Sequence, residues 1–331
     1  MAELVLGVGS SHSPMVSLSG EQWLEWGQRD LEHQGLYDLD GNHLSYADQL
    51  AAADGSMAAL VTLDACLAGA QRVEAAVARL REAVSAAELD ALIIVGDDQD
   101  EHLLAPNLPP FLVYWGDTIT NAPLAPAGEI PDLFRSFLRS YREPETERHY
   151  PVATDLALHL IDRAFEAGFD VATSDSLPQP ERGMGHAFGF PVRWLVTDEV
   201  PIVPVMVNTY NPPAQPRAGR CRAFGAMVRE AVDSLPDDRR VGIIASGGLS
   251  HFVVHEALDR DVLAAFGQGD LDRVVDVGEA AYVSGTSEIK NWLTVASACE
   301  GMPFELIDYV PGYRTPAGTG TGLGFALWHR C

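Results

Sequence analysis

The sequence predicts an α/β fold: a single domain with a central, mostly parallel mixed sheet flanked by helices, and a site at the C-terminal ends of the strands. Four apolar runs end in side chains capable of chemistry: LVLGVGSSH, ALIIVGDDQDEH, PIVPVMVNTY and VGIIASGGLSH. Helix-forming segments separate these runs, and such alternation is typical of parallel sheets. Because open α/β sheets bind ligands beyond the carboxyl ends of their strands, the four runs predict one shared site.

Each element follows from local composition. Short apolar runs, bounded by Gly, Pro or polar residues, predict strands over residues 3–9, 90–96, 111–115, 169–174, 201–208 and 241–245. Ala-rich or amphipathic segments predict a short helix within 21–34, two within 46–87 (the second over 67–87), and others over 131–141, 155–167, 222–234, 257–267 and 270–280. A further helix opens at SGTSEIKNW, with Ser284 or Thr286 as its N-cap.

Three segments lack a regular pattern. Residues 104–150 are rich in Pro, Gly, Asn and Thr, so we expect irregular cover over the site within one catalytic domain that spans 1–331. Residues 178–190 form a predicted glycine-rich loop. The tail, RTPAGTGTGLGFALWH, is also glycine-rich, but its glycines do not have the spacing of a nucleotide-binding loop.

Composition excludes several classes of function. The 331 residues carry a net charge of −25, which argues against binding nucleic acid or an anionic membrane. No apolar run approaches the roughly 18 to 20 residues that cross a bilayer, and no basic region opens the chain, so we expect a cytoplasmic protein. The four cysteines form no metal-binding or CxxC spacing, which predicts free thiols: Cys66, Cys221, Cys299 and Cys331.

Five positions stand out as candidates for chemistry. His12 lies in a Ser-Ser-His-Ser-Pro turn after a strand, where it suits a metal ligand or a histidine bonded to backbone. Residues 97–102 place four carboxylates after a strand, as either a hard-cation site or a solvated turn. His186 lies in an apolar loop, as a ligand contact or a packing residue. His251 ends the central strand, and Glu288 lies near a helix N-terminus, which favours its charged form.

These residue types favour redox metal chemistry over hydrolysis by a nucleophile. The sequence has no GxSxG elbow and no Cys/His pairing. Zinc generally binds a denser set of His and Cys residues. One or two histidines with one carboxylate suit non-haem Fe(II), which keeps open coordination positions.

Six motifs in order carry a family resemblance: SSHSP, GDDQDEH, GMGHAFGF, NTYNPPAQPRAGRC, SGGLSHFVVHEALD and SGTSEIKNW. Over about residues 3–329 the chain resembles the class III (LigB-type) extradiol ring-cleavage dioxygenases. Within that family it is most similar to the branch of 3-O-methylgallate dioxygenase and the protocatechuate 4,5-dioxygenase β-subunit. The resemblance implies an enzyme that opens the ring of a catechol- or gallate-type substrate with O2, using Fe(II).

The resemblance also implies roles for individual residues. His12 matches one iron-binding histidine and Glu288 the iron-binding carboxylate, while His251 matches the catalytic acid/base and His186 a histidine beside the substrate. The second iron-binding histidine is missing, because the family pattern Asn-Asp-His falls on Asp97-Asp98-Gln99. Gln99 is then the matching metal ligand, with Glu101 or His102 as alternatives.

The sequence also predicts residues that would contact the substrate, and possible protein partners. Tyr210 and Asn208 end a strand and are expected to line the pocket, and Arg220, Arg182 or Lys290 would bind a substrate carboxylate. We expect a homo-oligomer, and the resemblance leaves open a separately encoded small α-type subunit. Two other functions remain open: a divalent-metal hydrolase and a non-catalytic binding protein of the same fold. The hydrolase would use Asp97, Asp98 and Glu101 with His12.

Overall fold

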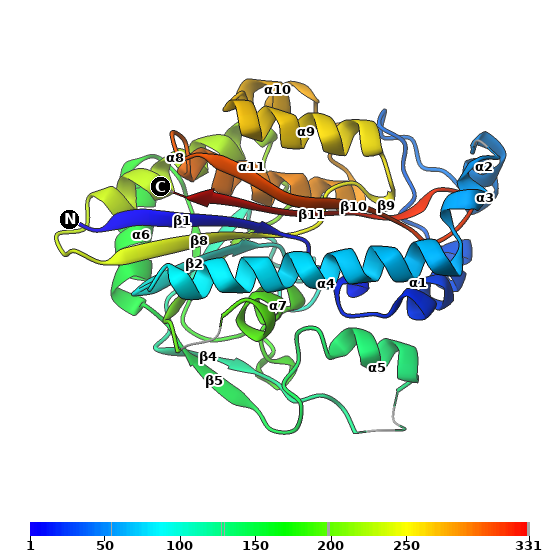
Figure 1. The fold of residues 1–331 in the computed structure, drawn as a ribbon. Coiled ribbons are helices and arrows are strands. Elements are labelled where there is room, and N and C mark those ends of the chain that lie inside the picture. Colours follow the sequence, from blue (N-terminus) through cyan, green and yellow to red (C-terminus); the bar gives the residue numbers. More distant parts are fainter. Residues whose placement is uncertain (54, 127, 129, 197–198, 330–331) are drawn as a thin grey trace.

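The computed structural model describes residues 1–53, 55–126, 128, 130–196 and 199–329, and its main sheet takes strands from both ends of the chain (Figure 1). The strand order is β10-β11-β1-β8-β2-β7-β3-β6, and β9 pairs with β11. The bounds are β1 Glu3–Ser10, β2 Ala91–Gly96, β3 Phe111–Tyr114, β6 Ala172–Ser174, β7 Ile202–Val207, β8 Arg240–Ser246, β9 His251–Val253, β10 Phe304–Tyr313 and β11 Thr319–His329.

The centre of the sheet is parallel and its flanks are antiparallel. β1, β8, β2 and β7 run in one direction as neighbours. β11 lies antiparallel to β1 on one side, and β3 lies antiparallel to β7 on the other. The predicted α/β class with a mostly parallel mixed central sheet is therefore confirmed, and the carboxyl ends of the central strands meet at one edge.

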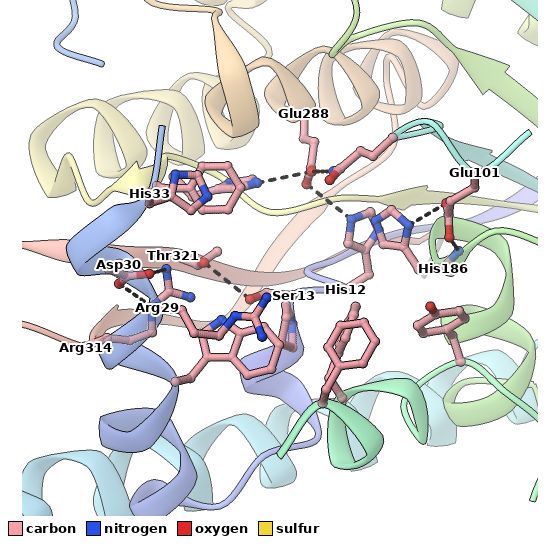
Figure 2. Close-up of a pocket in the computed structure, with 18 residues that line it drawn as sticks. His12, Ser13, Arg29, Asp30, His33, Glu101, His186, Glu288, Arg314 and Thr321 are labelled. Carbon is pink, nitrogen blue, oxygen red and sulfur yellow. Dashed lines mark hydrogen bonds and ion pairs between the residues drawn. The ribbon is translucent and has the colours of Figure 1, made fainter. Parts of the chain in front are cut away.

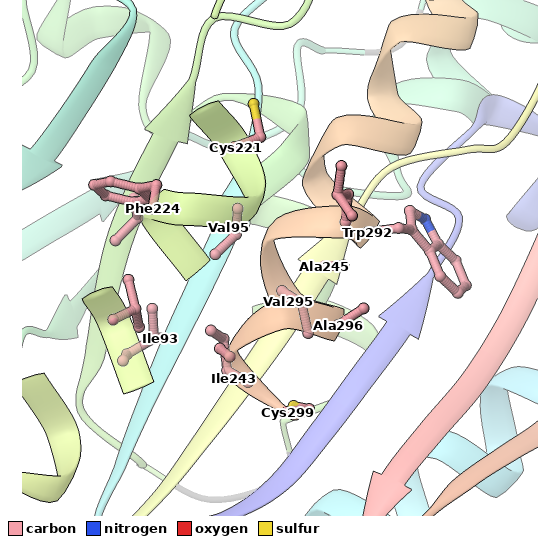
Figure 3. Packing of buried hydrophobic residues seen from close by; sticks show 14 of the residues in the cluster. Ile93, Val95, Cys221, Phe224, Ile243, Ala245, Trp292, Val295, Ala296 and Cys299 are labelled. Carbon is pink, nitrogen blue, oxygen red and sulfur yellow. The ribbon is translucent and has the colours of Figure 1, made fainter. Parts of the chain in front are cut away.

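Alternate side chains of the central strands enter two hydrophobic layers, one on each face of the sheet. On β2, Ile93 and Val95 pack into one layer, whereas Leu92 and Ile94 pack into the other. Figure 3 shows the first layer, where Phe224 of α8 and Val295 of α11 lie against the strands. Successive side chains of a strand point to opposite faces, so a sheet that is covered on both faces needs apolar residues at every position.

Helices cover both faces. The first layer is built by α6 Thr154–Glu166, α8 Ala218–Asp233, α9 Glu256–Gln268, α10 Leu271–Asp276 and α11 Ile289–Ala298. The second contains α1 Gly20–Gly27, α4 Leu63–Ala86 and α7 His186–Trp194, with α5 Asp132–Leu138 packed on its outside. Two short helices, α2 Tyr46–Ala52 and α3 Met57–Leu60, precede α4.

The structure corrects the predicted loop 178–190 and gives regular structure to the glycine-rich tail, for which no element was predicted. α7 begins at His186, inside the expected glycine-rich loop 178–190, and the glycine-rich tail forms β11, which pairs with β10. The expected cover segment contains β3, α5 and the small antiparallel sheet of β4 Thr118–Asn121 and β5 Arg148–Pro151. No helix in the described ranges is long and apolar enough to cross a membrane.

The predicted free thiols can be checked for three of the four cysteines. Cys66, Cys221 and Cys299 are free and buried, and burial raises the pKa of each thiol. Cys331 lies outside the described residues. Buried thiols of raised pKa act as small apolar side chains, so these three belong to the packing of the fold.

Candidate active site

Three neighbouring parallel strands deliver the candidate residues to one edge of the sheet. His12 lies two residues after the end of β1, Asp97 follows β2 directly, and β8 ends at Ser246. The imidazole Nδ1 of His12 lies 3.0 Å from Ser246 Oγ, which fixes the ring between two strand ends. Its Nε2 is buried and has no hydrogen-bond partner among the described residues. That nitrogen lies 3.4 Å from Glu288 Oε2.

Glu288 comes from a helical segment rather than from a strand end, and it is 1% exposed. It ends the 3₁₀ helix Ser284–Glu288, directly before α11. Its Oε2 accepts a 2.5 Å hydrogen bond from the Gly248 N–H, and its Oε1 accepts bonds from Gln99 Nε2 (2.9 Å) and His251 Nε2 (3.1 Å). Burial alone would raise the pKa of Glu288, but the neighbouring imidazoles hold that pKa well below its ordinary value. Glu288 is therefore a buried carboxylate.

Asp97 is the third potential ligand, and it is fully buried. One carboxylate oxygen accepts a hydrogen bond from Gln99 Nε2 at 3.1 Å, and the other from Asn291 Nδ2 at 3.3 Å. Burial, together with the Glu288 charge, raises the pKa of Asp97 to about 6. Ligand atoms of His12, Asp97 and Glu288 all lie within 4.8 Å of one another. The unpartnered Nε2 of His12 beside two buried carboxylates fits a divalent metal ion, whose charge would offset their repulsion.

Gln99 lies in this cluster as a hydrogen-bond donor. Its amide nitrogen faces Asp97 and Glu288, which are both acceptors, so the chemistry of the partners fixes the orientation of the amide. The amide oxygen therefore points away from the ligand atoms. Of the two alternatives, Glu101 bonds His186 Nδ1 at 2.7 Å, and His102 Nε2 bonds the Gly183 carbonyl at 2.7 Å.

His251 opens β9, and its ring is held on three sides. Nδ1 lies 2.8 Å from the Leu249 carbonyl, which can only accept, so Nδ1 carries the proton. Its backbone N–H donates to Thr286 Oγ1 at 3.1 Å. A Cβ atom on Gly285 would approach within 1.9 Å of the ring, so only glycine fits there. Nε2 faces the Glu288 carboxylate, which also only accepts, so both ring nitrogens carry protons here. Burial lowers the pKa of His251, but the Glu288 charge outweighs burial and raises that pKa. Nε2 is the ring nitrogen that borders the cavity and can exchange its proton there.

His186 opens α7 and forms a buried ion pair with Glu101. Besides the contact to Nδ1, Glu101 accepts the His186 backbone N–H at 2.9 Å. Burial lowers the pKa of His186, but the Glu101 carboxylate outweighs burial and raises that pKa to about 10. The ring stands edge-on to His12, with centroids 4.4 Å apart. His186 therefore places a cationic imidazole beside the candidate metal ligands.

These groups lie at one end of a cavity of about 370 Å³, within the size range of small-molecule sites (Figure 2). His12, Gln99, His186, His251 and Glu288 line it. Five aromatic side chains form much of its other walls: Trp26, Phe134, Phe137, Tyr141 and Phe252. Polar and charged residues, among them Arg29, Asp30, His33 and Arg314, complete the lining. A cavity with aromatic walls and polar groups toward both ends suits a small planar ligand that carries polar substituents.

Comparison with known proteins shows the family to which the chain belongs. Residues 116–324 match the family described as the catalytic LigB subunit of aromatic ring-opening dioxygenase. The chain belongs to this LigB family. The matched range includes His186, His251 and Glu288, whereas His12 and Asp97 precede it.

Several dioxygenases are similar to parts of the chain. The 2,3-dihydroxyphenylpropionate/2,3-dihydroxicinnamic acid 1,2-dioxygenase of Comamonas testosteroni is 28% identical over 182 residues, 54% of this chain and 48% of the relative. That of Paraburkholderia phymatum is 37% identical over 101 residues, 30% of each chain. A gallate dioxygenase of Pseudomonas putida is 39% identical over 77 residues, 22% of each chain. The match therefore spans about half the length of these relatives or less, and placement in the 3-O-methylgallate branch stays a prediction.

Other expected pocket residues lie outside the cavity wall of this LigB chain. Asn208 is buried and bonds within its own loop, donating to the Asn211 carbonyl at 2.9 Å. Tyr210 lies close enough to the site that, beyond the effect of burial, Glu288 and Asp97 raise its pKa. Arg220 instead donates to the Gly168 carbonyl at 2.7 Å and lies over the Phe169 ring.

The two remaining cations expected to bind a substrate carboxylate also lie elsewhere. Arg182 donates to the backbone carbonyls of Asp100 and Glu101, both at 3.0 Å. Lys290 pairs with Glu279 at 2.7 Å. None of the three expected cations lines the cavity, whereas Arg29 and Arg314 do, and Asp97 lies beside the cavity residues His12 and Glu288.

A buried carboxylate, Asp259, supports the turn that carries His251. It accepts hydrogen bonds from the Ser250 N–H (2.8 Å), the Ser250 hydroxyl (2.7 Å) and the Tyr309 hydroxyl (2.7 Å). Burial raises its pKa to about 6 despite these bonds. Sequence reasoning did not single out Asp259, although its position on α9 just after the His251 motif placed it within reach.

Replacing Asp259 with alanine should lower the free energy of unfolding by about 2 to 4 kcal/mol, because three buried donors lose their acceptor. Denaturant unfolding followed by circular dichroism measures the change. Asp272→Ala provides the control, since Asp272 forms an exposed pair with Arg222 and should change stability by about 0.5 kcal/mol or less. Equal stability of both variants would contradict the role given to Asp259.

Proposed function

We propose that this LigB-family protein is a metal-dependent extradiol dioxygenase that opens the ring of a small aromatic diol with O2. One observation carries the proposal: the unpartnered Nε2 of His12 lies with the Asp97 and Glu288 carboxylates at the end of an aromatic-walled cavity. The LigB family of aromatic ring-opening dioxygenases, and the similarity to dioxygenases of 2,3-dihydroxyphenylpropionate and gallate, support the same reaction class.

His12, Asp97 and Glu288 would hold the metal, with Fe(II) as the proposed ion. When bound, Fe(II) supplies Lewis acidity toward the diol and one-electron chemistry toward O2. The protein would supply orientation, since the aromatic walls accept a planar ring and place its diol edge among these polar groups.

His251 would act as the acid/base. Because Nδ1–H is engaged by the Leu249 carbonyl, Nε2 is the atom that would exchange a proton with the substrate. It would donate as an acid in the protonated form and, with Glu288 engaged by a bound metal, take a proton from a substrate hydroxyl in the neutral form. His186, cationic through its pair with Glu101, would donate a hydrogen bond to an oxygen on which negative charge develops. The two imidazoles thus have separate tasks, set by separate partners.

Oxygen uptake by anaerobically purified, Fe(II)-loaded protein tests the proposal. The panel would contain catechol, protocatechuate, gallate, 3-O-methylgallate and 2,3-dihydroxyphenylpropionate, with ultraviolet-visible spectra recorded for ring-opened product. We expect iron-dependent uptake of one O2 per ring opened, because both oxygen atoms enter the product. Anaerobic turnover of an ester with Mg²⁺, Mn²⁺ or Zn²⁺ would favour a hydrolase instead, and failure to bind metal would favour a non-catalytic protein.

A further inference from the structure

The end of the cavity away from His186 contains two arginines, and one of them is already neutralised. Figure 2 shows Arg29, Asp30 and Arg314 on one side of the cavity, with Glu101 and His186 on the other. Arg314 is 3% exposed, and its Nε and Nη2 donate to the Asp30 carboxylate at 3.0 and 3.2 Å. The charge of Arg314 is therefore matched within the fold.

Arg29 has no such partner. Among the residues that the structure describes, none forms an ion pair or a hydrogen bond with its guanidinium, which lies over the rings of Trp26 (4.9 Å) and Phe134 (5.7 Å). Contact with two aromatic rings positions the cation without using its N–H donors. Arg29 therefore offers a forked donor at the cavity wall that can bind a planar anion.

The strongly negative charge of the chain bears on the role of Arg29, an unpaired cation on the cavity wall. With a net charge of −25, the protein repels anions in general, and the described part of the chain pairs most of its arginines with carboxylates or backbone carbonyls. Arg29 is exposed, and a few other described arginines also lack a partner, but Arg29 is the one of these that lines the cavity. Its place between aromatic rings on the cavity wall suits a negatively charged ligand.

We propose that Arg29 is the anion-binding residue of the cavity, and that the substrate is an aromatic diol with a carboxylate-bearing substituent. This inference rests on the proposed function, which places the diol at His12 and Glu288. The ring would then lie between the aromatic walls, with the carboxylate reaching Arg29 and accepting two parallel N–H bonds from it.

Acids compared with their own methyl esters test this subsite, because each ester removes the charge and keeps the ring. The pairs are 2,3-dihydroxyphenylpropionate, protocatechuate and gallate with their methyl esters. Dissociation constants are measured anaerobically by calorimetry and kcat/KM by oxygen uptake. We expect the wild-type protein to favour an acid over its ester, and Arg29→Gln to lower affinity and kcat/KM for that acid about 10- to 100-fold through KM. The ester should change less than about threefold.

Two further variants separate the donor geometry from the net charge. Arg29→Lys keeps the charge but loses the forked donor, so it should fall between wild type and Arg29→Gln. Arg163→Gln removes one positive charge from α6, where Arg163 pairs with Glu166, and should leave both acid and ester unchanged. Melting temperatures of all variants within a few degrees of wild type would establish that they fold.

The outcomes distinguish this inference from the function on which it rests. Equal loss for acid and ester in Arg29→Gln, or no preference of the wild type for acids, would refute the anion subsite while leaving ring opening intact. Arg29-dependent binding of acids without oxygen uptake would refute the dioxygenase function and retain the subsite. Absence of binding by any acid or ester would overturn both.

Discussion

Asp97→Asn is expected to weaken divalent-metal binding by at least about 100-fold and to remove oxygen uptake with it. Asp97 contributes one of two buried carboxylates beside His12 Nε2, and the substitution removes half of the negative charge that would attract the ion. An amide in its place would also present N–H donors to a cation. Mn²⁺ binding followed by electron paramagnetic resonance, and iron content after anaerobic loading, measure the effect independently of activity.

Variants of Gln99 identify which residue replaces the missing family histidine. If Asp97 is the ligand and Gln99 only holds the two carboxylates, Gln99→Ala should weaken metal binding by about tenfold, the effect of losing a supporting hydrogen bond. Gln99→His should favour Co²⁺ or Zn²⁺ over Mn²⁺, since it adds an imidazole. Metal binding retained in Asp97→Asn but lost in Gln99→Ala would show that Gln99 is the ligand.

The central sheet could be predicted from the sequence because its strands are buried on both faces. Continuous apolar runs such as 90–96 and 241–245 have few other structures open to them. The tail received no predicted secondary structure, because its glycines were weighed only as a nucleotide-binding loop. In β11 the glycines alternate, and a Cβ on Gly322 or Gly324 would collide with Asp259 or Leu249. Alternation with period two was visible in TGTGLGF and is the signal that indicates a strand.

The candidate site was predicted in part. His12, His251 and Glu288 followed from family motifs, and the structure places them around one point. Asp97 was not predicted as an iron ligand, because the motif alignment directed attention to Gln99. The orientation of the Gln99 amide depends on Glu288, 189 residues away, and no local pattern contains that contact. Arg29 was not predicted either, because the sequence does not show that its guanidinium lines the cavity and lacks a carboxylate partner among the described residues.

His251→Ala is expected to lower kcat by about 10²- to 10⁴-fold while metal content stays at the wild-type level, which is the range for loss of a general acid/base. Nε2 of His251 lies 3.1 Å from Glu288 Oε1 but is not among the three grouped ligand atoms. Loss of the ring therefore removes proton transfer and leaves His12, Asp97 and Glu288 in place. Single-turnover kinetics with a bound diol separates the chemical step from substrate binding.

His251→Gln provides the control, because it keeps most of the volume of the histidine side chain but not its acid/base function. His251→Gln keeps a side chain that can donate to the Leu249 carbonyl and fill the space against Gly285, but it cannot exchange a proton near neutral pH. Both variants should therefore show the same loss in kcat. Wild-type activity in His251→Gln would mean that the ring only positions its neighbours, and loss of metal in both variants would make His251 a ligand. Because Nδ1 is held by a carbonyl and Nε2 faces the reacting end of the cavity, we expect neither result.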